Sequence, residues 1–265
     1  MKIWYQSGAA LGKNERYHEY FEMLKTHLQN VARPGTEVSV RGVERSSPIH
    51  QLSRYEEVLH NYQVAENFLQ AQKEGYDGFC VGCALDPAFY SIREIAEIPY
   101  CTLSEANMFL ACLLAPNFAL FCHNKQLLLR VSELVHRYRL DDRFIAIDSL
   151  GMKPAELNKA FDDPEFFLKP AREVARDAAG KGVTMFVVAE GIINMILVKH
   201  NITQIEGIPV IEGSGALVKI TEMMVDLKKM GIGASRQGLY AALPEGGFET
   251  LRQIYKPSPK GLDCT

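Results

Sequence analysis

Cys83 is the side chain in this sequence that is best placed for chemistry. It follows the apolar run 78–81 and precedes the helical pattern of residues 88–96. A cysteine that leaves a buried strand just before a helix lies near backbone N–H groups that favour its thiolate. Such a thiolate can attack an electrophile or move a proton. The alternative is a small residue that fills a tight turn. Asp86 is expected to shape this turn and to cap the helix after Cys83.

Glu190 occupies the matching place in the second half of the chain. The run 185–189 ahead of it mirrors the segment before Cys83, with an offset of 190 − 83 = 107, and residues 208–211 mirror 98–101 with an offset of 208 − 98 = 110. Two similar half-chains indicate two α/β lobes related by a pseudo-two-fold axis. Ligands in such sheets bind beyond the carboxyl ends of the strands. We therefore expect Cys83 and Glu190 to face one another across an interlobe cleft.

The neighbours of Glu190 in sequence are apolar, since Val187, Val188, Ile192 and Ile193 surround it. A carboxylate is costly in such a setting unless it is paired or protonated, which favours a site role. The alternative is a glutamate that caps the following helix.

Composition excludes several classes of protein. The 265 residues are 47% hydrophobic and 23% charged, and the net charge is −3, so no basic field favours nucleic acid or an anionic membrane. No apolar run approaches the roughly 18 residues that span a bilayer. The chain begins as a strand, without a signal-peptide pattern. We expect a cytoplasmic protein with no nucleic-acid or membrane partner.

The six cysteines are scattered, which is typical of free thiols in a reducing compartment rather than of a disulfide framework. Cys80 and Cys83 form a C-x-x-C, but Cys80 falls inside the strand, which disfavours a redox pair. The sequence holds no second C-x-x-C and no H-x₃₋₅-H pair. We therefore expect no metal.

Apolar runs alternate with helical patterns along the whole chain, which predicts an α/β fold with a largely parallel sheet. The predicted lobes are residues 1–114 and residues 115–215, and residues 216–235 are a candidate addition to the first lobe. An irregular tail follows over 236–265, where only 248–255 favours a short helix. Strands are predicted at 2–6, 38–43, 78–82, 98–102, 118–123, 144–147, 185–191 and 208–211. Helices are predicted at about 14–31, 55–74, 87–96 and 125–138, with a long one before Gly182.

Several stretches of this chain match one family. They are 83–87, 93–99, 104–106, 118–123, 136–143, 207–210 and 216–219. In these motifs and their order, over roughly residues 1–225, the chain resembles the aspartate/glutamate/hydantoin racemase superfamily, in its hydantoin racemase-like branch. The resemblance implies two Rossmann-like lobes, an interlobe active-site cleft and chemistry without a cofactor. In the usual members one cysteine from each lobe flanks the α-carbon of the substrate, and Cys83 matches the first of them.

The second cysteine of the family is replaced by Glu190, in the turn Ala189-Glu190-Gly191. A free thiol titrates near pH 8.5 and a free carboxylate near 4.3, so the pair is matched only if the cleft shifts both groups. Racemisation stays open. Chemistry in one direction is an equal fit, with Glu190 as general base and Cys83 as nucleophile or proton donor.

The strand ends depart from the family pattern as well. His123 stands where a cleft hydroxyl is usual and could assist thiolate formation, whereas Cys122 is expected in the core. The first strand ends in Gln6-Ser7 instead of an Asn-Pro-Asn-Thr-like loop, which indicates changed specificity. The resemblance and the lobe symmetry together give six expected substrate-binding residues, which are Gln6, Ser7, Ala84, Ser104, Gly191 and Ser214.

The leading hypothesis is a cofactor-independent racemase, epimerase or related isomerase. It moves a proton at a carbon next to a carbonyl or carboxylate of a small polar molecule of the hydantoin, amino acid or dicarboxylate type, with Cys83, Glu190 and His123 as catalytic residues. The alternative is a hydrolase of a cyclic amide or imide, or a decarboxylase, on the same scaffold. A binding protein that has lost the matched pair is a third possibility. A homo-oligomer is expected.

Overall fold

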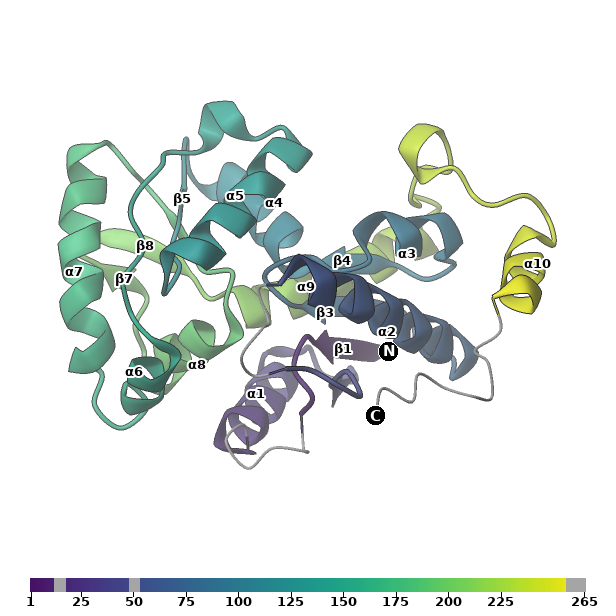
Figure 1. Ribbon diagram of the computed structural model, residues 1–265, viewed down its shortest axis with the longest axis horizontal. Helices are drawn as coiled ribbons and strands as arrows, with labels where there is room; N and C mark the ends of the chain where they lie inside the picture. The colour runs from purple at the N-terminus through teal and green to yellow at the C-terminus, as the bar shows by residue number, and fades with distance from the viewer. Residues whose placement is uncertain (12–17, 48–52, 256–265) are drawn as a thin grey trace.

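Two four-stranded sheets, one from each half of the chain, form the framework of the computed structural model, which describes residues 1–11, 18–47 and 53–255 (Figure 1). The strand order is β2-β1-β3-β4 in the first sheet and β5-β6-β8-β7 in the second. All of these strand pairs are parallel except β7–β8. The predicted α/β fold with mainly parallel sheets is confirmed.

The first half alternates strands with helices, as its hydrophobic pattern predicts. Strands β1 and β3 lie at the centre of the sheet, and all five residues of β3 are buried. The elements are β1 (Lys2–Ser7), α1 (His18–Val31), β2 (Glu37–Arg41), α2 (Arg54–Lys73), β3 (Gly78–Gly82), α3 (Phe89–Ile95), β4 (Tyr100–Thr102) and α4 (Leu103–Leu114).

The second half has shorter strands in a different order, in which β6 lies between β5 and β8 as β3 lies between β1 and β4. Its elements are β5 (Ala119–Leu120), α5 (Lys125–Tyr138), the 3₁₀ helix η2 (Asp141–Arg143), α6 (Pro154–Lys159), α7 (Glu165–Gly180), β6 (Phe186–Val187), α8 (Gly191–Lys199), β7 (Gln204–Ile205) and β8 (Ile208–Ile211). The strand predicted at 144–147 is wrong, since only an isolated bridge joins Phe144 to Phe118. After Ile145 the chain leaves the ladder and bonds again only at Leu150, whose N–H donates to the Cys122 carbonyl.

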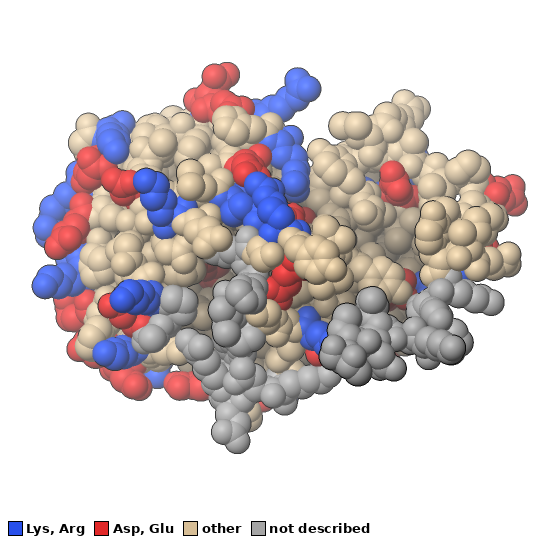
Figure 2. Space-filling model, in the orientation of Figure 1, with Lys and Arg blue, Asp and Glu red and all other residues tan. Residues whose placement is uncertain are grey.

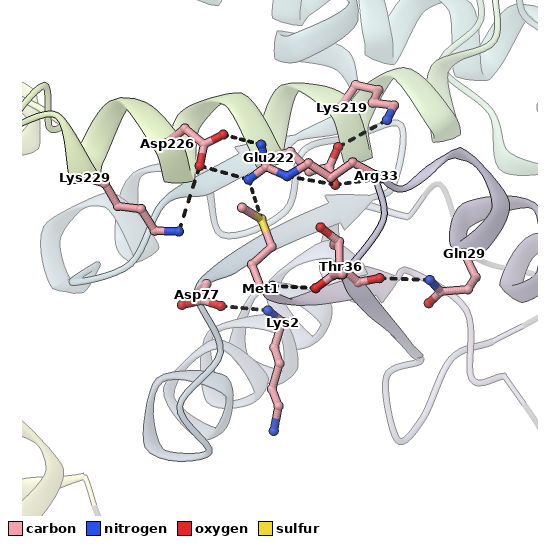
Figure 3. Close-up of polar contacts among 11 residues, drawn as sticks. Met1, Lys2, Gln29, Arg33, Thr36, Asp77, Lys219, Glu222, Asp226 and Lys229 are labelled. Carbon is pink, nitrogen blue, oxygen red and sulfur yellow. Dashed lines mark hydrogen bonds and ion pairs between the residues drawn. The ribbon is translucent and has the colours of Figure 1, made fainter.

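Helix α9 (Gly213–Lys229) follows the second sheet but packs against the first, where it contacts β1, β3 and β4. A Cβ added to Gly78 would lie 2.9 Å from the Thr221 and Val225 side chains, so the helix approaches β3 closely. Arg33, just after α1, fixes its outer face (Figure 3): the Arg33 N–H donates to Glu222 at 3.0 Å, and its Nη2 donates to Asp226 Oδ1 at 2.9 Å. The lobe boundaries at 114 and 215 stay a prediction.

The chain after α9 runs back over α3. The Arg236 guanidinium donates to the Arg93 carbonyl at 2.9 Å and so contacts the carboxyl end of α3. The Tyr240 ring, in the 3₁₀ helix η3 (Gly238–Tyr240), lies 4.9 Å from the Arg93 guanidinium. Beyond it, α10 (Gly247–Ile254) begins one residue before the predicted short helix and has no buried residue. It lies at the far right of Figure 1.

The surface shows no single field of charge on the face seen in Figure 2, where basic and acidic side chains are interspersed. None of the described helices combines the length and the apolar character needed to cross a membrane.

Candidate functional site

Cys83 lies at the carboxyl end of β3, where its side chain is half-buried. A Cβ added to Gly8 would lie 2.8 Å from the Cys83 sulfur, so the chain leaving β1 passes directly over the thiol. Burial raises the pKa of the Cys83 thiol to about 11, and the charges of Asp86 and Glu57 act in the same direction, against a lowering by the Leu85 N–H. The thiol is therefore protonated at neutral pH, and the expected activation by a helix N-terminus is wrong.

The turn after Cys83 explains that difference. Asp86 and Ala88 adopt φ values of 45° and 58°, in the left-handed region that non-glycine residues seldom occupy. They turn the chain so that α3 begins only at Phe89, six residues after the thiol. The expectation that Asp86 caps this helix is also wrong. Its carboxylate instead accepts from the Ser104 and Glu105 N–H groups, both at 2.9 Å, and so caps α4.

Side chains from four other elements hold this turn in place. Asn61 of α2 accepts from the Ala88 N–H at 2.8 Å, and the Tyr100 hydroxyl of β4 donates to the Pro87 carbonyl at 3.0 Å. Ser104 of α4 donates to the Ala84 carbonyl at 2.6 Å, and Tyr138 of α5 donates to Asp86 at 2.6 Å. Left-handed backbone of this kind persists only when its surroundings fix it, and it is concentrated at functional sites.

Glu190 stands after β6, and its carboxylate is bonded to His123. Oε1 accepts from the His123 backbone N–H at 2.7 Å, and Oε2 lies 2.5 Å from His123 Nδ1. The Glu190 residue is 8% exposed, so this pairing compensates the cost of burying a carboxylate. Glu190 is the N-cap residue of α8, but its side chain makes no capping bond. The alternative of a capping glutamate is therefore wrong.

Asn124 determines which nitrogen of the His123 ring carries the hydrogen. Its Oδ1 accepts from the Leu127 N–H at 2.8 Å, as the N-cap of α5, so its Nδ2 is the atom that faces His123 Nε2 at 2.7 Å. An amide nitrogen only donates, hence Nε2 accepts and Nδ1 carries the proton toward Glu190. The ring is thus oriented from both sides.

Three of the expected substrate-binding residues have polar partners within the protein. The Gln6 amide accepts from Trp4 at 3.0 Å and from Asn67 at 2.9 Å, and donates to the Ser7 carbonyl at 2.9 Å. The Ser7 hydroxyl accepts from the Ala9 N–H at 3.2 Å. Ser104 is the residue that donates to Ala84. Contact of these residues with a substrate stays a prediction.

Gly191 and Ser214 lie where the two halves meet. A Cβ added to Gly191 would be 2.2 Å from the Tyr20 hydroxyl of α1, so glycine is required there for the close approach. The Ser214 hydroxyl, at the start of α9, is buried beside the Tyr5 phenol, whose pKa it lowers against the larger effect of burial. Their role in binding also stays a prediction. Cys122 is buried in the core, as expected.

Sequence reasoning missed the residues that support the site, namely Asn61, Tyr100, Asn124 and Tyr138. Of these, only Asn124 gives a local signal, an asparagine just before an apolar helical pattern. In the described part of the chain, no group of three or more His, Cys, Asp or Glu side chains could hold a metal ion. A cavity of about 200 Å³ lies between α3, α9 and the tail, and neither Cys83 nor Glu190 lines it.

The fold and the site define a class: a two-lobed α/β protein with a protonated thiol after a central strand of one lobe and a carboxylate–imidazole pair after the matching strand of the other. A sequence model of the Asp/Glu/hydantoin racemase family matches residues 18–221. The chain belongs to this family, and the prediction of a racemase of this superfamily is confirmed.

Relatives and solved structures agree. The chain is 26% identical to a hydantoin racemase of Pseudomonas sp. (strain NS671) over 201 residues. This alignment covers 76% of this chain and 79% of the relative. Among solved structures it is similar to an allantoin racemase from Klebsiella pneumoniae, with a TM-score of 0.74, 23% identity and 92% and 94% of the two chains covered. An allantoin racemase from Pseudomonas fluorescens has a TM-score of 0.74 at 19% identity, with 92% and 97% covered.

Proposed function

We propose that this protein racemises a small cyclic amide of the hydantoin type, by moving the proton on the ring carbon next to a carbonyl. The observation that carries the proposal is the placement of Cys83 after the central strand β3 of one sheet, and of the hydrogen-bonded Glu190 and His123 after the neighbouring strands β6 and β5 of the other. The names of the relatives point to the same chemical class.

The reaction needs one base and one acid on opposite faces of the ring carbon. In the resting state the Cys83 thiol holds its proton, and the Glu190–His123 pair is free to accept one. The Glu190 carboxylate, held by His123, takes the proton from the ring carbon, and the bonding electrons move to the adjacent carbonyl oxygen. The thiol then gives its proton to the opposite face. The enzyme returns to its resting state when the pair loses a proton to solvent and the thiolate gains one.

The chemical difference between Cys83 and the Glu190–His123 pair affects the rate of racemisation and not the final ratio of the two enantiomers. Because enantiomers have equal free energy, the product is racemic whatever the catalyst. The resting enzyme, with a protonated Cys83 and an unprotonated Glu190, is ready to convert one enantiomer. The other enantiomer needs the reverse state, with a Cys83 thiolate and a protonated Glu190–His123 pair. We therefore expect unequal kcat values for the two enantiomers. The same side chains carry every proton, so the proposed reaction uses no cofactor.

The experiment that tests this function is proton NMR of the purified protein in D₂O with each enantiomer of a 5-substituted hydantoin and of allantoin. Loss of the ring C–H signal without new product signals, together with loss of optical rotation, is the expected result. Ring-opened or decarboxylated products would overturn it, and so would unchanged spectra with every compound.

Two further properties belong to the proposal. The protein is cytoplasmic, which its free cysteines support. It assembles as a homo-oligomer, which the exposed apolar stripe of α2 supports, since Tyr55, Val58, Leu59 and Tyr62 recur at helical spacing and are 45–76% exposed. Sedimentation of the purified protein checks the assembly, and a monomer at all concentrations would contradict it.

A further inference from the structure

One helix, α5, contacts both halves of the candidate site. Its N-cap residue Asn124 lies 2.7 Å from His123 Nε2, and its last residue, Tyr138, donates to Asp86 at 2.6 Å in the turn after Cys83. The 14 residues of the helix span about 21 Å. A single rigid element therefore joins the imidazole of one lobe to the thiol turn of the other.

The turn after Cys83 is also packed into the hydrophobic core of the second half. Leu85 is 9% exposed and belongs to the same apolar cluster as Leu127, Val131 and Val135 of α5. The hydrogen bond from Tyr138 to Asp86 is thus accompanied by burial of the preceding residue, Leu85, in the cluster to which α5 contributes. The other three side chains that hold the turn, those of Asn61, Tyr100 and Ser104, all come from the first half of the chain and do not connect it to the second.

Ion pairs fix the middle of α5 to α2 of the first half. Arg130 pairs with Glu57, and Glu133 pairs with Arg54 at 2.5 Å. Arg130 is 9% exposed at its side chain, whereas Arg54 and Glu133 are more than half exposed, so the Arg130 pair is the less screened of the two. Polar contacts therefore hold α5 at both ends and in the middle.

We infer that Tyr138 is a positioning residue for the reaction. It fixes the Cys83 turn to α5 and thereby sets the place of the thiol relative to His123 and Glu190. The inference rests on the proposed function for its catalytic meaning. Its structural content, that Tyr138 holds the Cys83 turn, stands on the contacts of Asp86 and Leu85 alone.

The test compares Tyr138→Phe with Tyr100→Phe. Each variant removes one phenol hydroxyl that bonds the same turn, and each keeps the ring that packs against Phe89 or Phe79. Of these two tyrosines, only Tyr138 belongs to α5. We expect Tyr138→Phe to lower kcat for a 5-substituted hydantoin at least tenfold with KM changed less than threefold, and Tyr100→Phe to lower kcat less than threefold.

A second readout does not depend on any substrate. The rate at which iodoacetamide alkylates Cys83, followed by peptide mass spectrometry, reports how freely the turn moves, with Cys112 of α4 as an internal reference. We expect Tyr138→Phe to raise the Cys83 rate threefold or more and to leave the Cys112 rate unchanged.

The outcomes separate the two proposals. An unchanged Cys83 alkylation rate overturns the role of Tyr138 whatever the activity. A raised rate with unchanged kcat shows that the bond is structural and overturns the positioning role, and so does an equal loss of kcat in Tyr100→Phe. If the wild type exchanges no ring proton, the proposed function fails, and the alkylation rates still decide whether Tyr138 holds the turn.

Discussion

The turn after β3 and the turn after β6 each follow a central strand that has a parallel neighbour on both sides, yet they are built differently. Cys83 leaves β3 as a half-buried thiol in a turn with two left-handed residues, and side chains from four elements hold that turn. Glu190 is in extended backbone, and both of its oxygens are bonded to His123. In the first lobe the structure constrains the backbone that carries the reactive atom. In the second it constrains the reactive group itself.

This difference teaches how one scaffold accommodates two kinds of proton carrier. A thiol makes weak hydrogen bonds, so its position depends on the chain that carries it. A buried carboxylate demands partners, and those partners orient it. Replacing the second cysteine of the family by Glu190 therefore goes together with His123 and Asn124, which supply them.

The largest expected effect comes from Cys83→Ser. A serine hydroxyl does not replace the thiol as a proton donor, so the variant should lose about 10²–10⁴-fold in the rate of ring-proton exchange. Exchange is followed by NMR in D₂O. Cys112→Ser is the matched control, because Cys112 lies on α4 and is half-buried like Cys83. Equal losses in both variants would remove Cys83 from the mechanism.

Glu190→Gln should lower the exchange rate by about 10²-fold, within the range of general base catalysis. The amide keeps an acceptor for the His123 N–H, but its NH₂ group meets the Nδ1 proton. His123→Asn removes the ring and should have an effect of similar size if the two act as one unit. The double variant then loses no more than either single one, whereas multiplied losses would show independent roles.

The pH dependence of alkylation sharpens the contrast between the two turns. Only the thiolate reacts, and the pKa of Cys83 is raised to about 11. The Cys83 rate with iodoacetamide should therefore rise about tenfold per pH unit from pH 7 to about 10, without levelling near 8.5 as a free thiol does. A plateau below pH 9 in the peptide-resolved rate would contradict the burial of this sulfur.

The smallest expected effect separates two serines at equivalent places, Ser104 and Ser214. Ser104→Ala leaves the Ala84 carbonyl without its donor and should lower the free energy of unfolding by about 1 kcal/mol. Ser214→Ala removes a buried hydroxyl whose contact with the Tyr5 phenol falls outside good hydrogen-bond geometry and should change it by less than about 0.5 kcal/mol. Urea unfolding of the two variants measures both values, and a larger loss for Ser214→Ala would invert the comparison.

Much of the fold followed from the sequence because its patterns are local. The strand 78–82 and the helix 125–138 have the predicted bounds, and 208–211 forms β8 as expected. The resemblance singled out Cys83 and Glu190. Their surroundings could not be predicted, since Asp86 caps a helix 18 residues further on and Tyr138 reaches it from 52 residues away. An alanine with φ of 58° at position 88 also gives no warning in the sequence, because alanine seldom adopts that conformation.

The return of α9 to the first sheet has a consequence for how the protein is made. The side chains of Thr221 and Val225 cover strand β3. Because synthesis runs from the N-terminus, the ribosome makes these two residues about 140 residues after β3. Until then, the part of the N-terminal sheet that α9 covers lacks this partner. The nascent first lobe therefore stays incomplete while the whole second lobe is synthesised, and a chain released before α9 would present an apolar sheet face to chaperones and proteases.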